Sequence, residues 1–210
     1  MILRLLAGFL LLFQPVLWAA TPHAPELAVC WDYGCSSRTG VTLPDAVWRR
    51  IRTLFLPAAS SPAVERERIR RAITLMDRTI GKLTPVGNDY GGSQPWAGLP
   101  GQQDCIDESL TALSELEALE RAGLLHWHRV TGRARRAPHL FDVHWTAVIE
   151  EKATGRRFAV DPWYGDQGEP PVIQPLADWL RGVKPPDLPP RTRSRGLDSR
   201  LLMQSLESDP

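Results

Sequence analysis

The sequence contains few cysteines, no internal repeat and almost no net charge. Three of its 210 residues are cysteine, and 25 basic side chains stand against 24 acidic ones, for a net charge of +1. This balance gives no support to nucleic-acid binding through the charge of the whole protein. Apolar residues make up 43% and charged residues 23%, which is typical of a globular protein. The length fits one domain with a core of its own.

Long apolar runs are missing except at the start of the chain. Residues 1–20 contain a basic residue, Arg4, then an apolar stretch, and they end in two alanines, as in an export signal. The apolar stretch is shorter than the ~20 residues that a spanning helix needs, and Pro15 interrupts it. We therefore expect a signal peptide over residues 1–20 and a periplasmic or secreted protein. An uncleaved membrane anchor is the alternative.

The three cysteines divide unevenly in the oxidising compartment that export implies. Cys30 and Cys35 lie in the segment CWDYGC, where Gly34 can turn the chain. Either they form a short-loop disulfide or they are two packed thiols. Cys105 is the odd cysteine in both cases, and an unpaired cysteine in an exported protein requires an explanation.

Helical spacing of apolar residues dominates the first half of the chain, and strand patterns dominate the second half. Helices followed by strands predict an α+β domain with helices on one side of an antiparallel sheet. A further strand and a helical turn are expected within residues 170–181. The helices are expected over residues 43–56, 60–83 and 104–123, and the main strands over residues 124–130, 141–151 and 156–164. Residues 21–42 are expected to be extended, with a short strand near Val41. The expected buried edge of the third helix consists of Ile106, Leu110, Leu113, Leu116 and either Leu119 or Ala122.

Two segments lack the pattern of a packed element. Residues 84–104 hold five glycines and three prolines and lead directly to Cys105, and a loop of this length is often functional. Trp96 within it is a candidate for contact with a substrate. Residues 184–210 are rich in proline and arginine and are expected to lack a packed core. The folded domain is therefore expected to span residues 21–183.

Cys105 stands at the predicted start of the third helix, where the positive end of the helix dipole favours a thiolate. A thiolate nucleophile needs a base and a group that holds the base. Alternation in the strand over residues 141–151 places His144 on its less apolar face, beside an expected cleft. Asp161 ends the next strand, and a tight hairpin between the strands brings it next to His144. Cys105, His144 and Asp161 are therefore the catalytic candidates.

These motifs resemble those of the transglutaminase-like branch of the papain-like cysteine enzymes. The resemblance covers roughly residues 100–165 and rests on DCID, HWTAVIEE and GRRFAVDPW, which place Cys105, His144 and Asp161 in the order of that superfamily. The sequence is also similar to bacterial periplasmic transglutaminase-like cysteine proteinases. The resemblance implies a papain-like core in which the helix bearing the cysteine packs on an antiparallel sheet.

The resemblance also implies an activity and its site. It implies an exported peptidase or amidase that forms a thioester acyl-enzyme with a protein or peptide of the cell envelope. The glycine that often precedes the cysteine is replaced by the segment QQD, so we take Gln103 as the candidate oxyanion donor, with the Gln102 amide or the Trp96 indole as alternatives. No cofactor is expected, although some relatives bind calcium beside the cysteine, which Asp104 and Asp107 can do here. Both acids also complement the helix dipole.

Other interpretations stay open on the sequence alone. A non-enzymatic binding protein of the cell envelope can share this fold, and a cross-linking transglutaminase shares the acyl-enzyme. A metal site is a third alternative, although no tight ligand motif such as HExxH occurs. Its ligands would come from His126, His128, His139, His144, Cys105 and Asp161.

Overall fold

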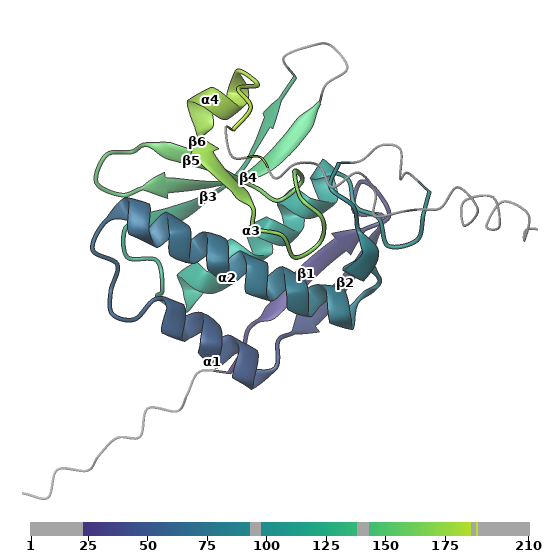
Figure 1. Ribbon diagram of the computed structural model, residues 1–210, viewed down its shortest axis with the longest axis horizontal. Coiled ribbons are helices and arrows are strands. Elements are labelled where there is room, and N and C mark those ends of the chain that lie inside the picture. Colours follow the sequence, from purple (N-terminus) through teal and green to yellow (C-terminus); the bar gives the residue numbers. More distant parts are fainter. Residues whose placement is uncertain (1–22, 93–97, 138–142, 186–187, 189–210) are drawn as a thin grey trace, which may run out of the picture.

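The computed structural model describes residues 23–92, 98–137, 143–185 and 188. The expected signal peptide, Trp96, His139 and most of the expected tail lie outside the described residues. Within them the protein is a mixed α+β structure with two antiparallel sheets (Figure 1). The α+β class predicted from the sequence is confirmed at this level.

The strands of the described residues belong to two separate sheets. One sheet pairs β1 with β2, and the other has the order β3–β4–β5–β6. The elements are β1 (Glu26–Trp31), β2 (Ser37–Thr42), α1 (Asp45–Leu54), α2 (Pro62–Leu83), the 3-10 helix η1 (Pro85–Asn88), α3 (Cys105–Arg121), β3 (His128–Arg136), β4 (His144–Glu151), β5 (Arg157–Asp161), β6 (Val172–Pro175) and α4 (Leu176–Leu180).

The three predicted helices are confirmed, with ends within two residues of those expected. The start of α2 is fixed by Ser61, whose hydroxyl accepts the Val64 N–H at 3.3 Å, and by Pro62 in the first turn. Helix α3 ends just before Gly123, which has a φ of 69° that a side chain would disfavour.

Helix α3 is the central element of the domain. It contacts β1 on one side and β3, β4 and β5 on the other, and α2 crosses in front of it (Figure 1). Leu116 and Leu119 are fully buried there, whereas the expected core residues Ile106, Leu110 and Leu113 are only half-buried. The buried face of α3 instead includes polar residues of its first half. The apolar stripe predicted for this helix was therefore wrong over its first two turns, because packing on both sides buries the polar face as well.

The segment before α1 forms a hairpin, although the sequence predicted only a short strand near Val41 within an extended stretch. Strands β1 and β2 pair in register from Glu26 with Thr42 to Trp31 with Ser37. A disulfide between Cys30 and Cys35 closes the turn. This bond is consistent with an oxidising environment.

Strand β4 is buried on both faces, which differs from the prediction of one open face. On the face of His144, Val148 packs with Ala159, Leu176 and Trp179 into a small second core. Helix α4 therefore covers the side of the strand that was expected to border a cleft. The sequence did not show this cover, because a helix of five residues carries too little periodicity.

Strand β3 begins later than predicted, at His128 in place of residue 124, and continues to Arg136. The preceding chain is held by Glu65 of α2, whose carboxylate accepts the backbone N–H groups of His126, Trp127 and His128 at 2.7–3.0 Å. His128 also contacts Glu65 through its ring Nδ1 at 2.9 Å. This contact occupies one ring nitrogen of a histidine that the metal alternative named as a possible ligand.

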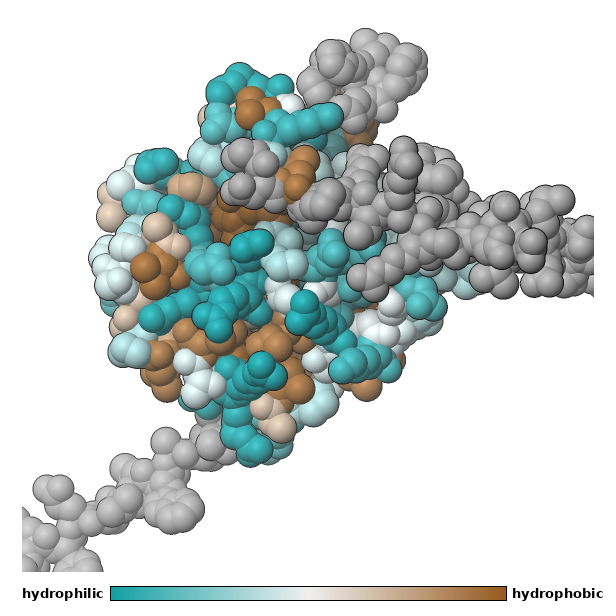
Figure 2. Space-filling view, in the orientation of Figure 1, coloured by the Kyte–Doolittle hydropathy of each residue, from teal (hydrophilic) through white to brown (hydrophobic). Residues whose placement is uncertain are grey.

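The surface over α1 and α2 mixes hydrophilic and hydrophobic side chains (Figure 2). Hydrophilic residues lie across the middle of this face, where α2 runs (Figures 1 and 2). In the part of the chain that the structure describes, no helix combines the length and the apolar character needed to cross a membrane.

Candidate active site

The first turn of α3 positions Cys105. Asp104 caps the helix, and its Oδ1 accepts the N–H groups of Ile106 and Asp107, both at 2.9 Å. Asp107 returns a bond by accepting the Asp104 N–H at 3.0 Å, which completes a capping box. Cys105 is thereby the first residue of the helix, and it is half-buried.

The same two acids attach the disulfide hairpin to the start of α3. Asp104 accepts the Gly34 N–H at 3.0 Å, and Asp107 accepts the N–H groups of Tyr33 at 2.9 Å and Cys35 at 2.5 Å. Burial raises the pKa of Asp107 to about 6. The carboxylate oxygens of Asp104 and Asp107, which a calcium ion would need as ligands, already accept backbone N–H groups. Among the described residues, no three His, Cys, Asp or Glu side chains gather as ligands for a metal ion.

His144 and Asp161 form a buried hydrogen-bonded pair. The imidazole Nε2–H donates to Asp161 Oδ2 at 2.8 Å, and the two side chains are 4% and 1% exposed. This bond fixes the tautomer, so Nδ1 is the nitrogen that remains for a proton from another group. The β4–β5 hairpin that the sequence predicted brings the two residues together.

Cys105 lies at the other side of the imidazole. Its Sγ is 3.9 Å from the carbonyl oxygen of Val143, the residue before His144. Burial lowers the pKa of His144, but hydrogen bonds with Asp161 and Cys105 and the negative charges of both residues outweigh it and raise this pKa to about 9. The three residues chosen from the sequence therefore meet at one place, with the imidazole between the thiol and the carboxylate.

Three aromatic residues that the sequence did not assign to the site lie around the His144–Asp161 pair. The His144 ring centroid lies 4.6 Å from that of Trp163, 5.5 Å from that of Trp179 and 6.1 Å from that of Tyr164. Trp179 also donates its Nε1–H to Asp161 Oδ2 at 2.7 Å. The carboxylate oxygen that holds the imidazole is thus itself held by a buried tryptophan. Of the three aromatic residues, only Trp163 could have been assigned to the site from the sequence, because it lies two residues after Asp161.

Arg136 fixes Trp179 in turn. Its guanidinium carbon lies 4.6 Å from the indole centroid, and Nη1 donates to the Trp179 carbonyl oxygen at 2.6 Å. Nη2 donates to the Tyr164 hydroxyl at 3.1 Å. Arg136 pairs directly with His144 in the β3–β4 ladder, so the same strand pair supplies the base and the group that orders its support.

The Trp179–Asp161 bond predicts a measurable loss of stability. Changing Trp179→Phe keeps a buried ring but removes the donor, and a hydrogen bond to a charged group contributes about 1.5–3 kcal/mol. Trp48→Phe is the matched control, because Trp48 is also buried and its Nε1 has no hydrogen-bond partner. We expect the free energy of unfolding at pH 7, measured by urea denaturation, to fall about 2 kcal/mol further for Trp179→Phe. Equal losses in the two variants would contradict the assignment.

Gln103, the candidate oxyanion donor, is buried just before α3. Its Nε2 donates to the Cys30 carbonyl oxygen at 2.6 Å, and its backbone N–H donates to Asp89 at 2.8 Å. One of the two hydrogens of the Gln103 side-chain amide therefore links the segment before α3 to β1 through a hydrogen bond. Its role toward an oxyanion stays a prediction. Trp96 lies outside the described residues.

Two glutamates on the buried face of α3 each form a pair with an aspartate from outside the helix. Asp77 of α2 faces Glu115, and Asp89 faces Glu108; burial raises the pKa of Asp77 to about 7 and that of Asp89 to about 8. Burial also places the pKa values of Glu108 and Glu115 well above their ordinary range. Both oxygens of Glu115 and Oε2 of Glu108 are buried and have no hydrogen-bond partner other than the facing acid. A proton shared within each pair supplies the missing hydrogen bond.

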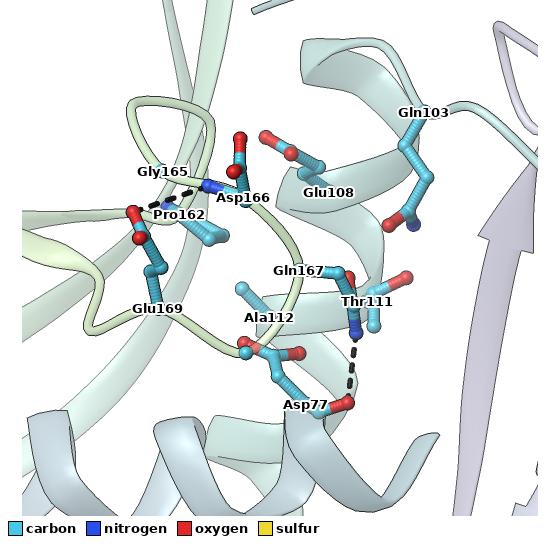
Figure 3. A pocket seen from close by; sticks show the side chains of 11 residues that line it. Asp77, Gln103, Glu108, Thr111, Ala112, Pro162, Gly165, Asp166, Gln167 and Glu169 are labelled. Atoms are coloured by element: carbon cyan, nitrogen blue, oxygen red, sulfur yellow. Dashed lines mark hydrogen bonds between the residues drawn. The ribbon is translucent and has the colours of Figure 1, made fainter. Parts of the chain in front are cut away.

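Figure 3 shows two of these acids, Asp77 and Glu108, beside the loop between β5 and β6. Asp77 and Glu108 line a small pocket together with Asp166 and Glu169, and the Gln167 side chain donates to the Asp77 carbonyl oxygen at 2.9 Å. The pocket adjoins Pro162, the residue after Asp161. No pattern in the sequence indicates this cluster, because acids on helices normally indicate a solvated face.

Comparisons of the chain with protein-family models, with curated proteins and with solved structures found no match.

Proposed function

We propose that the protein is an exported cysteine hydrolase of the transglutaminase-like type, a peptidase or amidase with Cys105 as nucleophile. The observation that carries the proposal is the buried His144–Asp161 bond beside a helix-start cysteine. The raised pKa of His144 supports it, since an imidazolium next to the cysteine is the partner that a thiolate needs. The papain-like core of that superfamily is part of the proposal.

Proton transfer from the Cys105 thiol to His144 forms a thiolate–imidazolium pair, and the reaction begins from this pair. The thiolate sulfur attacks the carbonyl carbon of an amide, a carbon–sulfur bond forms, and the carbonyl oxygen takes up the negative charge. The carbon–nitrogen bond then breaks as His144 returns its proton to the leaving amine. Water, deprotonated by His144, attacks the thioester and releases the carboxylic acid and the thiol. Asp161 holds the imidazole in the tautomer that both steps require.

The oxyanion needs a donor close to the sulfur. Asp104 already accepts the N–H groups of Ile106 and Asp107 through its side chain and that of Glu108 through its carbonyl. Among the described residues, the Cys105 N–H is the first-turn donor that has no acceptor. We assign it to the oxyanion, together with the amide hydrogen of Gln103 that its bond to Cys30 leaves over.

Digestion of a mixed peptide library, followed by mass spectrometry, tests this function. We expect the mature protein to cleave amide bonds and Cys105→Ala to cleave at least 1,000-fold more slowly, about the cost of removing a nucleophile. Hydroxylamine should release an acyl group from wild type alone, since a thioester is the intermediate. Addition of a primary amine separates the alternatives, because a transglutaminase transfers most of the acyl group to the amine, whereas a hydrolase transfers it mainly to water.

Two results would overturn the proposal. Equal cleavage by Cys105→Ala would remove Cys105 from the reaction. An absence of cleavage together with a thiol that reacts like a free cysteine would leave the binding protein as the remaining interpretation. EDTA is expected to leave activity unchanged, and loss of activity on chelation would favour the metal alternative.

A further inference from the structure

The end of β3 beside the catalytic residues carries positive charge without a matching acid. Arg133, Arg135 and Arg136 occupy the part of β3 that pairs with the start of β4. None of these three forms an ion pair within the described ranges of the chain. At the other end of the strand, Arg129 pairs with Glu150. The unmatched charge is therefore confined to the end of the strand next to His144.

Arg133 is the arginine that reaches the helix of the nucleophile. Its Nη1 donates to Ser109 Oγ at 3.1 Å, and Ser109 follows Cys105 by one helical turn. Its guanidinium carbon lies 4.6 Å from the ring centroid of Trp145, the neighbour of His144. These two contacts hold the guanidinium between α3 and β4, on the side of Cys105.

The guanidinium has donors to spare. It carries five N–H groups in a rigid fork, and among the described residues the Ser109 hydroxyl is its one hydrogen-bond acceptor. The side chain is half-buried, and stacking on Trp145 fixes the plane of the fork. A planar fork of this kind is suited to bind a carboxylate through two parallel hydrogen bonds. Burial lowers the pKa of Arg133, whereas the negative charge of Cys105 raises it, which agrees with close approach of the two groups.

We propose that Arg133 is a specificity-determining residue that binds a carboxylate of the substrate next to the amide that Cys105 attacks. One helical turn is about 5.4 Å and an extended residue about 3.4 Å long, so the carboxylate belongs to one of the two residues nearest the scissile bond. It is the side chain of an aspartate or glutamate or the terminal carboxylate of a peptide. The inference rests on the proposed function of Cys105.

The charge of the alkylating agent tests the inference without a known substrate. Iodoacetate carries a carboxylate and iodoacetamide carries an amide of the same size, and both lose iodide to the thiolate. We expect Arg133→Gln to lower the ratio of the iodoacetate rate to the iodoacetamide rate about fivefold at low salt, because a nearby charge is lost. Arg133→Lys should keep most of the ratio, since it preserves the charge. Arg129→Gln, at the distant end of the strand, should keep all of it.

The outcomes separate the two proposals. A thiol that alkylates like a free cysteine at every pH would count against the proposed function itself. An activated thiol whose rate ratio is the same in wild type and Arg133→Gln would overturn the role of Arg133 alone. A ratio that falls equally in Arg129→Gln would also overturn it, because the effect would then come from general surface charge.

Peptide digestion identifies the source of the carboxylate. Cleavage sites in a library should be enriched in aspartate or glutamate within two residues of the bond, or in bonds near the free C-terminus, and the enrichment should disappear in Arg133→Gln. Amidated peptides distinguish the two sources, because only terminal recognition is lost on amidation. Cleavage by wild type without either enrichment would contradict the inference.

Discussion

Replacing His144 by alanine is expected to slow alkylation of Cys105 by iodoacetamide roughly 100-fold at pH 6. In wild type the raised pKa of His144, about 9, keeps the imidazole protonated next to the sulfur across the neutral range. We therefore expect wild type to react with iodoacetamide below pH 7. Without the imidazole, the thiol should react only as the pH approaches the pKa of a free cysteine, ~8.5. Only a few per cent of such a thiol is ionised at neutral pH. The rate of alkylation of the mature protein from pH 5 to pH 10, followed by intact mass, measures this difference.

His126→Ala is the matched control for this experiment. His126 is exposed and lies just before β3, so its loss should leave the alkylation profile unchanged. Asp161→Asn should give a smaller shift in the same direction as His144→Ala, because the imidazolium loses its buried partner. Superimposable profiles for wild type and His144→Ala would remove the Cys105–His144 pair from the mechanism.

The free energy of unfolding is expected to fall on the order of a few kcal/mol between pH 5 and pH 8. Burial raises the pKa of Asp77 from 3.8 to about 7 and that of Asp89 to about 8. A group with a raised pKa in the folded state contributes stability below its unfolded pKa, near 4, and loses that contribution as the pH rises through the folded value. His144 acts in the same direction up to about pH 9. Urea denaturation at several pH values measures the slope.

The double variant Asp77→Asn with Glu115→Gln should flatten this slope. The two amides keep the shape of the pair and a hydrogen bond between the side chains, but they do not titrate. Glu117→Gln on the same helix is the control, because the Glu117 side chain is about half exposed and pairs with Arg121 at 3.4 Å. The interpretation of the acid pair would be wrong if the double variant kept the wild-type slope, or if wild type were more stable at pH 8 than at pH 5.

The sequence alone was sufficient to predict α1, α2 and α3, the β4–β5 hairpin and the three residues that meet at the candidate site. These rest on local rules: apolar spacing predicted α2, the turn after Glu151 predicted the hairpin, and strand order then required Asp161 to lie beside His144. The position of Cys105 at a helix start followed from capping residues next to it. Local patterns fix such features because each depends on neighbours within a few residues.

The tertiary structure alone decided what surrounds those residues. Trp179 reaches Asp161 from a helix of five residues, and Arg133 reaches Ser109 from another strand, so neither contact has a local pattern. The acids of α3 became buried because α2 and the loop between β5 and β6 pack over them, which opposes the ordinary preference of charge for water. Long-range packing sets the burial, protonation and partners of a side chain, and these properties separate a reactive cysteine from a structural one.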